Sequence, residues 1–117
     1  MVWMFGGTQV PTLTEDQKID HLIVYIETLK GATFIRNGSE HTAQDAAAHL
    51  RLKRNKAGSR IKTAVQFIEK LGSKSSMSGE PYVIKFSNGK MFTCELVLRA
   101  ELKRLESGQT TLLKPKL

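Results

Sequence analysis

FIRNGSEHTAQDAAAHLRLK, residues 34–53, is the stretch that decides how this chain folds. Near its start lies Asn37-Gly38, a pair that favours the type I′ turn because both central residues of that turn need positive φ. A two-residue loop at this pair makes a β-hairpin in which alternate residues of the two strands share a face. The residues predicted on one face are Phe34, Arg36, Ser39 and His41.

The hairpin leads directly into a predicted helix. Thr42 has the character of an N-cap, Asp45 lies in the first turn, and no helix breaker follows until Gly58. Acids near the start and cations near the end suit the helix dipole. Small side chains should let another element approach closely, and the larger contacts are expected from leucines; these positions are Ala43, Ala46, Ala47, Ala48, Leu50 and Leu52.

Similar signals mark elements on both sides of this stretch. Thr14 with Gln17, and Thr63 with Gln66, are capping boxes that predict one helix over about 15–30 and a short one ending at Gly72. A turn-rich connector, 73–82, precedes a second Asn-Gly pair at 88–89. This pair again predicts a type I′ hairpin, and Thr93 then caps a last helix.

The predicted fold class is therefore α+β, in the order α-ββ-α-α-ββ-α. Two Asn-Gly hairpins, which can join into one antiparallel sheet, pack with about four helices. We expect a loose lead-in at 1–13, a single domain at 14–106 and a flexible tail at 107–117. A chain of 117 residues is long enough for one core. No apolar run reaches the roughly 18 residues needed to span a bilayer.

The net charge of +7 permits an acidic partner, and the positive charge is concentrated in one part of the chain. Residues 15–45 are net acidic, whereas 46–62 contain basic residues and no acid. A nucleic-acid interface and an ordinary solvated helix face both fit this run, and the second is favoured because no aromatic side chain is interleaved for base stacking. The basic patch consists of Arg51, Arg54, Lys56, Arg60 and Lys62.

Few residues have the spacing of a known catalytic or metal site. The three histidines, at positions 21, 41 and 49, form no pair that could present two ligands on one helix face. One cysteine, Cys94, excludes a disulfide within the chain. No metal or cofactor is predicted. A small hydrolase or transferase using the serine-rich loop 73–79 with His41 or His49 remains an alternative, but hydrogen-bonded turns explain these serines more simply.

The favoured function is a noncatalytic binding or interaction module. The first hairpin should fold back on the following helix and bring polar side chains toward the serine connector. Such a cluster suits an anion or a peptide carboxylate, because arginine offers a planar fork of donors. The alternative is that these groups satisfy the protein's own backbone. The candidate residues are Arg36, His41, His49, Lys53, Ser75, Ser76 and Ser78.

Three linked motifs carry a family resemblance. They are F-I-R-N-G-S-E-H-T-A with the alanine-rich run after it, T-A-x-x-F-I-E, and S-K-S-S-M-S-G-x-P-Y-x-I. Over about residues 18–106 the chain resembles the YfeK-like bacterial family, a domain of unknown function numbered five-three-two-nine. The resemblance implies no activity. It does imply an exported or periplasmic protein, whereas residues 1–11 lack the features of a signal peptide, so a trimmed or cytoplasmic chain is the other expectation.

The resemblance also bears on the sheet. Many relatives carry two cysteines, at positions that correspond to Ala32 and Phe86 here. If those cysteines pair in the relatives, the two hairpins lie side by side in one sheet.

Overall fold

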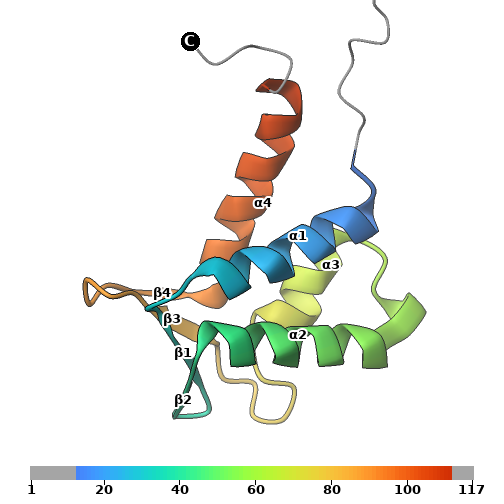
Figure 1. Cartoon of the computed structure of the whole chain (residues 1–117). Coiled ribbons are helices and arrows are strands. Elements are labelled where there is room, and N and C mark those ends of the chain that lie inside the picture. The colour runs from blue at the N-terminus through green and yellow to red at the C-terminus, as the bar shows by residue number, and fades with distance from the viewer. Residues whose placement is uncertain (1–12, 112–117) are drawn as a thin grey trace, which may run out of the picture.

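The computed structural model describes residues 13–111, and the expectations for 1–12 and 112–117 lie outside this range. The fold is α+β, with helices and strands in the predicted order (Figure 1). The elements are α1 (Glu15–Thr28), β1 (Thr33–Arg36), β2 (Ser39–His41), α2 (Ala43–Ala57), the 3-10 turn η2 (Gly58–Arg60), α3 (Ala64–Gln66), the π-helical segment η3 (Phe67–Gly72), β3 (Val83–Lys85), β4 (Met91–Thr93) and α4 (Cys94–Thr111).

The two hairpins form one antiparallel sheet, in the order β2-β1-β3-β4. They join where β1 pairs with β3, with Phe34 opposite Ile84 and Thr33 opposite Lys85. The next position along this ladder sets Ala32 across from Phe86. The side-by-side arrangement implied by the family resemblance is therefore confirmed.

The two hairpins have different loops. Asn37 and Gly38 both have positive φ, 52° and 78°, so the first loop is the predicted two-residue turn. In the second hairpin the Phe86 amide donates to the Lys90 carbonyl at 2.8 Å, and Asn88 has no positive φ. The loop therefore holds three residues, 87–89, and the predicted type I′ turn at 88–89 is wrong.

Burial explains the longer loop. A shift of one residue in a β-ladder moves every side chain of the strand to the opposite face. With the observed register the Cys94 amide donates to the Tyr82 carbonyl at 2.8 Å, and both side chains are buried on the same face as Ile84. A two-residue loop would turn Cys94 away from the core. Burial thus outweighs the local preference of the Asn-Gly pair.

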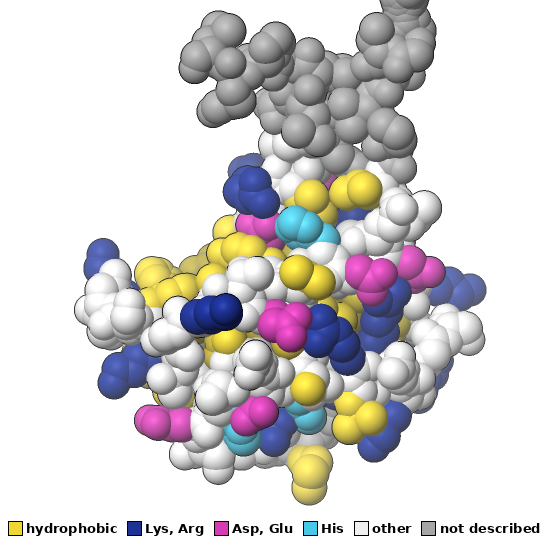
Figure 2. All heavy atoms as spheres, in the orientation of Figure 1, with side chains coloured by type: hydrophobic (Ala, Val, Ile, Leu, Met, Phe, Trp, Pro, Cys, Tyr) yellow, Lys and Arg dark blue, Asp and Glu magenta, His cyan; other side chains and the backbone are white. Residues whose placement is uncertain are grey.

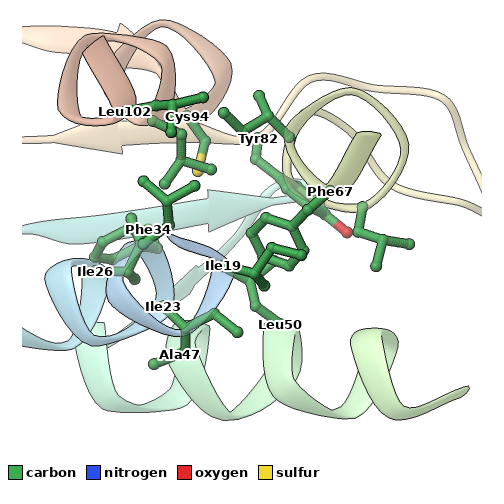
Figure 3. Packing of buried hydrophobic residues seen from close by; sticks show 14 of the residues in the cluster. Ile19, Ile23, Ile26, Phe34, Ala47, Leu50, Phe67, Tyr82, Cys94 and Leu102 are labelled. Atoms are coloured by element: carbon green, nitrogen blue, oxygen red, sulfur yellow. The ribbon is translucent and has the colours of Figure 1, made fainter. Parts of the chain in front are cut away.

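The core lies between this face of the sheet and the helices. Figure 3 shows side chains from the sheet, α1, α2, η3 and α4 meeting there. The apolar stripe of α1 is fully or almost fully buried at Ile19, Leu22, Ile23 and Ile26. At Gly72 a Cβ atom would lie 2.8 Å from Leu98 Cδ1, so a larger residue here would force the buried Leu98 side chain to move.

Helix starts are predicted well and helix faces less well. The threonines at 14, 42, 63 and 93 each accept a backbone N–H at the start of a helix. On α2 Ala43 and Ala47 are buried as expected, but Ala48 is exposed. Leu52 is 51% exposed, so the expectation that it supplies a large contact is wrong. Its position on α2 faces away from α1 and the sheet.

Two helix ends differ from the expected positions. α1 ends at Thr28, slightly before the predicted end, and α4 continues to Thr111, beyond the expected domain end at 106. The proposed division of the chain into lead-in, domain and tail stays a prediction. Within residues 13–111, no helix combines the length and the apolar character that a membrane crossing requires.

Candidate functional site

A cavity of about 170 Å³ lies between the first hairpin and α2. We call it the hairpin cavity. It has apolar walls and a polar side, and its lining residues are Phe34, Ile35, Arg36, His41, Asp45, Ala46, His49, Leu50, Tyr82 and Cys94. An adjoining depression, the connector groove, shares Arg36, His49 and Tyr82 with it and extends over Asn37, Lys53, Lys56, Ser75, Ser76 and Met77.

Arg36 lies at the junction of the two depressions. It is the last residue of β1, on the hairpin face that also carries Phe34 and His41. Its side chain makes no hydrogen bond or ion pair with any residue of the described range, whereas each of the other five arginines has at least one acceptor. The five N–H donors of its guanidinium are therefore available.

His41 contributes a second unsatisfied group. It stands opposite Phe34 in the hairpin and lines the hairpin cavity. Its Nε2 atom is buried and has no hydrogen-bond partner within the described residues. Buried polar atoms are normally paired, so an unpaired one beside a cavity calls for an explanation.

Lys53, Tyr82 and His49 form a hydrogen-bonded chain beside Arg36. Lys53 Nζ donates to Tyr82 Oη at 3.0 Å, and His49 Nε2 lies 3.4 Å from the same oxygen. Because an ammonium group only donates, the tyrosine accepts from Lys53 and has its own proton left for His49 Nε2. Lys53 also donates to the carbonyls of Leu71 and Lys74, at 2.9 and 3.3 Å. Its three protons are all engaged by the protein.

The pKa values agree with a site that carries excess positive charge. Burial, followed by the nearby charges of Arg36, Lys53, His41 and Lys56, lowers the pKa of His49 to about 4. Burial and then Arg36 also lower the pKa of Lys53. His49 is consequently neutral near pH 7 and can accept the tyrosine proton. Asp45 is the sole acidic residue among those that line the two depressions.

The serine connector is held by hydrogen bonds to the tip of the first hairpin. The Asn37 amide donates to Ser75 Oγ at 3.2 Å and its oxygen accepts from Ser78 Oγ. Ser75 Oγ also accepts the backbone amides of Met77 and Ser78, and Ser78 Oγ accepts that of Glu80. Among the described residues no serine hydroxyl bonds a histidine ring.

The structure gathers most of the candidate residues predicted from the sequence. Arg36, His41, His49, Lys53, Ser75 and Ser76 line one or both depressions, whereas Ser78 supports the hairpin tip. Sequence reasoning missed Phe34, Leu50, Tyr82 and Cys94 as parts of the cavity wall. Tyr82 directly precedes β3, but only the pairing of β1 with β3 brings it next to Arg36. Burial raises the pKa of the Cys94 thiol to about 12, so it stays protonated.

The basic patch is partly neutralised by the acidic helix α1. Arg51 pairs with Glu27 at 3.0 Å, and Arg54 pairs with both Asp16 and Asp20. The side chain of Arg54 is only 22% exposed, so this arginine does not fit the solvated helix face that the sequence favoured for the basic run. Figure 2 shows acidic and basic side chains intermixed on the side of the molecule where α1 and α2 face the viewer.

The rest of the patch is more open. Lys56, Arg60 and Lys62 are exposed as residues. Arg60 donates to the carbonyls of Lys56 and Ala57 at the end of α2. Its guanidinium therefore caps the helix as well as carrying charge. Lys56 and Lys62 have no side-chain hydrogen bond within the described range.

Comparisons with known proteins identify relatives without naming an activity. The Salmonella typhimurium protein named "Uncharacterized protein YfeK" is 43% identical over 68 residues, which cover 58% of this chain and 57% of that protein. The match thus spans little more than half of the relative's length. No solved structure matches the chain. The model of the family of unknown function DUF5329 matches residues 13–106, and the chain belongs to that family.

Proposed function

We propose that this protein is a noncatalytic binding module whose ligand presents a carboxylate, or an anion of similar shape, to Arg36. The observation that carries the proposal is the Arg36 guanidinium, which lines both depressions and has no partner among the described residues. Arginine side chains that leave bulk water are normally paired, because a desolvated charge is costly without a partner. A carboxylate can accept two parallel N–H bonds from a guanidinium.

The surroundings of Arg36 favour an anion over a neutral ligand. Arg36, Lys53 and Lys56 all act on His49, and their charges lower its pKa. All three protons of Lys53 are used by the protein, so Lys53 would not hydrogen-bond a ligand. It would attract an anion through its charge and form a rigid part of the groove. A bound anion would relieve the mutual repulsion of these cations. The half-buried setting makes that relief larger than it would be on an open surface.

The walls of the hairpin cavity suit an apolar group beside the anion. Phe34, Leu50 and Ala46 contribute apolar surface, and Cys94 is a protonated thiol there. His41 Nε2, which has no hydrogen-bond partner in residues 13–111, offers one polar contact within this wall. A ligand with an apolar body and a carboxylate would use both parts. Small-molecule sites commonly combine mainly apolar walls with a few placed polar groups.

Two other functions have less support. A nucleic-acid interface would use the basic patch, but Arg51 and Arg54 are engaged by acids of α1. A hydrolase or transferase would need an activated serine, but Ser75 Oγ accepts three hydrogen bonds in the connector and His49 is paired with Tyr82. An activated nucleophile requires a base within hydrogen-bond reach.

Phenylacetate is a suitable probe of the proposed site, with its neutral analogue 2-phenylethanol as the matched ligand. Binding is followed by NMR shifts of the backbone amides and of the Arg36 Nε–H group. We expect phenylacetate to shift resonances of Arg36, His41 and His49, and the alcohol to bind at least about tenfold more weakly, because it cannot form the charge-assisted pair.

The variant Arg36→Gln removes the charge and keeps a polar side chain. It should lose phenylacetate binding, whereas the control Arg51→Gln, an exposed arginine paired with Glu27, should retain it. Equal binding of the acid by the two variants would reject the proposed site. Loss of the folded NMR spectrum in Arg36→Gln is not expected, since the Arg36 side chain makes no hydrogen bond or ion pair with the described residues.

A further inference from the structure

The connector groove continues into a third depression on the surface of α2. This third depression, the basic groove, shares Lys53, Lys56 and Ser76 with the connector groove. It adds Arg60 and Lys70 from η2 and η3. The three depressions therefore adjoin one another in series, from the hairpin cavity at one end to the basic groove at the other.

The two ends of this tract differ in character. The hairpin cavity has the apolar walls described above. The basic groove is lined by Lys53, Lys56, Arg60 and Lys70, together with Ala57, Ile61, Leu71 and Ser76, and no acidic residue is among its lining. Arg36 stands between these two ends. Along the tract, the apolar hairpin cavity is thus followed by the Arg36 guanidinium and then by the lysines and the arginine of the basic groove.

We propose that this tract binds the carboxy-terminal end of an acidic peptide, with an apolar last residue. The apolar side chain fills the hairpin cavity, its free carboxylate pairs with Arg36, and the preceding acidic residues lie along the basic groove. This inference rests on the proposed function, because it uses the same anion site at Arg36. It adds the nature of the ligand, its direction along α2 and the role of the lysines.

The size of the cavity agrees with a single side chain. An apolar cavity of about 150 Å³ accommodates one benzene molecule, and the hairpin cavity has a similar volume of about 170 Å³. A phenylalanine or leucine side chain is therefore of a size that would fill it. A nucleotide chain would place phosphates along the groove, but it offers no compact apolar terminus that carries an anion.

The distance between His49 and Lys56 on α2 sets how many peptide residues the tract can contact. His49 and Lys56 are seven residues apart on one helix, a rise of about 10 Å. An extended peptide covers this distance with about three residues. Acidic side chains one to three residues before the carboxy-terminal residue would then meet Lys56 and Lys70. Both lysines are exposed and have no side-chain partner within the described range.

The probe peptide is acetyl-Gly-Glu-Asp-Glu-Phe with a free carboxylate, and its affinity is measured by calorimetry. Three altered peptides each remove one feature: a carboxy-terminal amide, alanine in place of phenylalanine, and glutamine and asparagine in place of the acids. We expect each alteration to weaken binding by about tenfold or more, as the loss of one charge-assisted or apolar contact produces.

Two pairs of protein variants test where the peptide lies. The double variant Lys56→Gln with Lys70→Gln should weaken binding of the acidic peptide by about tenfold and leave binding of the neutralised peptide unchanged. The control, Lys85→Gln with Lys103→Gln, removes the same charge elsewhere. Ala46→Met should fill the cavity and abolish the preference for phenylalanine over alanine. Ala48→Met, on the exposed face of α2, is its control. Both controls should bind as the unaltered protein does.

The outcomes separate this inference from the proposed function. If phenylacetate binds at Arg36 but the acidic peptide binds no more tightly than its neutralised form, the peptide inference is overturned and the proposed function stands. The same holds if both double lysine variants lose equal affinity, since the attraction is then nonspecific. If neither phenylacetate nor any peptide binds in an Arg36-dependent manner, both proposals fail.

Discussion

Lys53 Nζ lies 3.0 Å from Tyr82 Oη and ties the middle of α2 to the residue that leads into β3. The same ammonium holds the carbonyls of Leu71 and Lys74, so one side chain joins α2, the end of η3 and the serine connector. Lys53 belongs to the basic run of the sequence, but its role in the structure is that of a half-buried crosslink.

Replacing Lys53 with methionine should therefore destabilise the fold. Two backbone carbonyls and the Tyr82 hydroxyl would lose their donor, and the expected fall in the free energy of unfolding is about 1–3 kcal/mol. The control is Lys56→Met, one turn away on the exposed side, with an expected change within about 0.5 kcal/mol. Urea titrations of both variants provide the measurement. Equal stabilities would show that the hydrogen bonds of Lys53 do not hold these elements together.

Stability should fall in mild acid because of His49. Its pKa is about 4 in the folded protein and about 6.5 in the unfolded chain, so the unfolded chain binds protons first as the pH falls. The contribution of the neutral imidazole is fully present above pH 6.5 and is lost progressively between about pH 6.5 and 4.

The variant His49→Gln has no such proton-binding group. As the pH is lowered from about 6.5 to 4, the melting temperature of the unaltered protein should therefore fall relative to that of the variant. Below about pH 4 the difference should become constant. A difference that is independent of pH from 7 to 4 would contradict the lowered pKa of His49.

The glycines of the two hairpins should each be required for backbone conformation. Gly38 and Gly89 have φ of 78° and 88°, and a Cβ atom at either position would meet nothing within 4 Å. Valine at either site should lower stability by roughly 1 kcal/mol or more, entirely through the backbone. Glu40→Val, on an exposed strand position, is the control. Unchanged thermal melts of both glycine variants would show that these turns are not under this constraint.

Cysteines introduced at Ala32 and Phe86 should form a disulfide under mild oxidation. Position 32 precedes Thr33 and position 86 follows Lys85, so in the antiparallel β1–β3 ladder the two lie across from each other. Cysteines at 32 and 85 serve as control, because successive residues of a strand point to opposite faces. Crosslinking is read by mass spectrometry with thiol alkylation. Two free introduced thiols at 32 and 86 after oxidation would argue against the observed register.

Charge reversal in the basic run should have unequal effects. Arg54→Glu places a carboxylate beside Asp16 and Asp20, so it should destabilise the contact of α2 with α1 by about 1 kcal/mol. Lys56→Glu has no such neighbour and should leave stability unchanged. Added salt should reduce the loss in Arg54→Glu because exposed charges are screened. Identical melting temperatures for the two variants at low salt would contradict this pairing.

Local chemistry in the sequence determined most of the secondary structure. Each threonine cap acts within four residues of its own position, so the starts of the helices could be recognised without knowing what they pack against. The Asn37-Gly38 turn and its register are local in the same sense. The apolar stripe of α1 depends only on helical spacing, and all of its central isoleucines and leucines are buried.

Only the tertiary structure decided the length of the second hairpin loop, which charged side chains have partners, and which residues line the site. Asn88-Gly89 carries the same local signal as the first pair, but the burial of Cys94 selects a three-residue loop. Arg54 and Arg36 look alike in sequence, yet one meets two aspartates from α1 and the other meets no acceptor within the described residues. Tyr82 reaches the site only because β1 pairs with β3. Such contacts join residues that are distant along the chain, and side chains at such distances are brought together by burial and strand pairing, which no local pattern encodes.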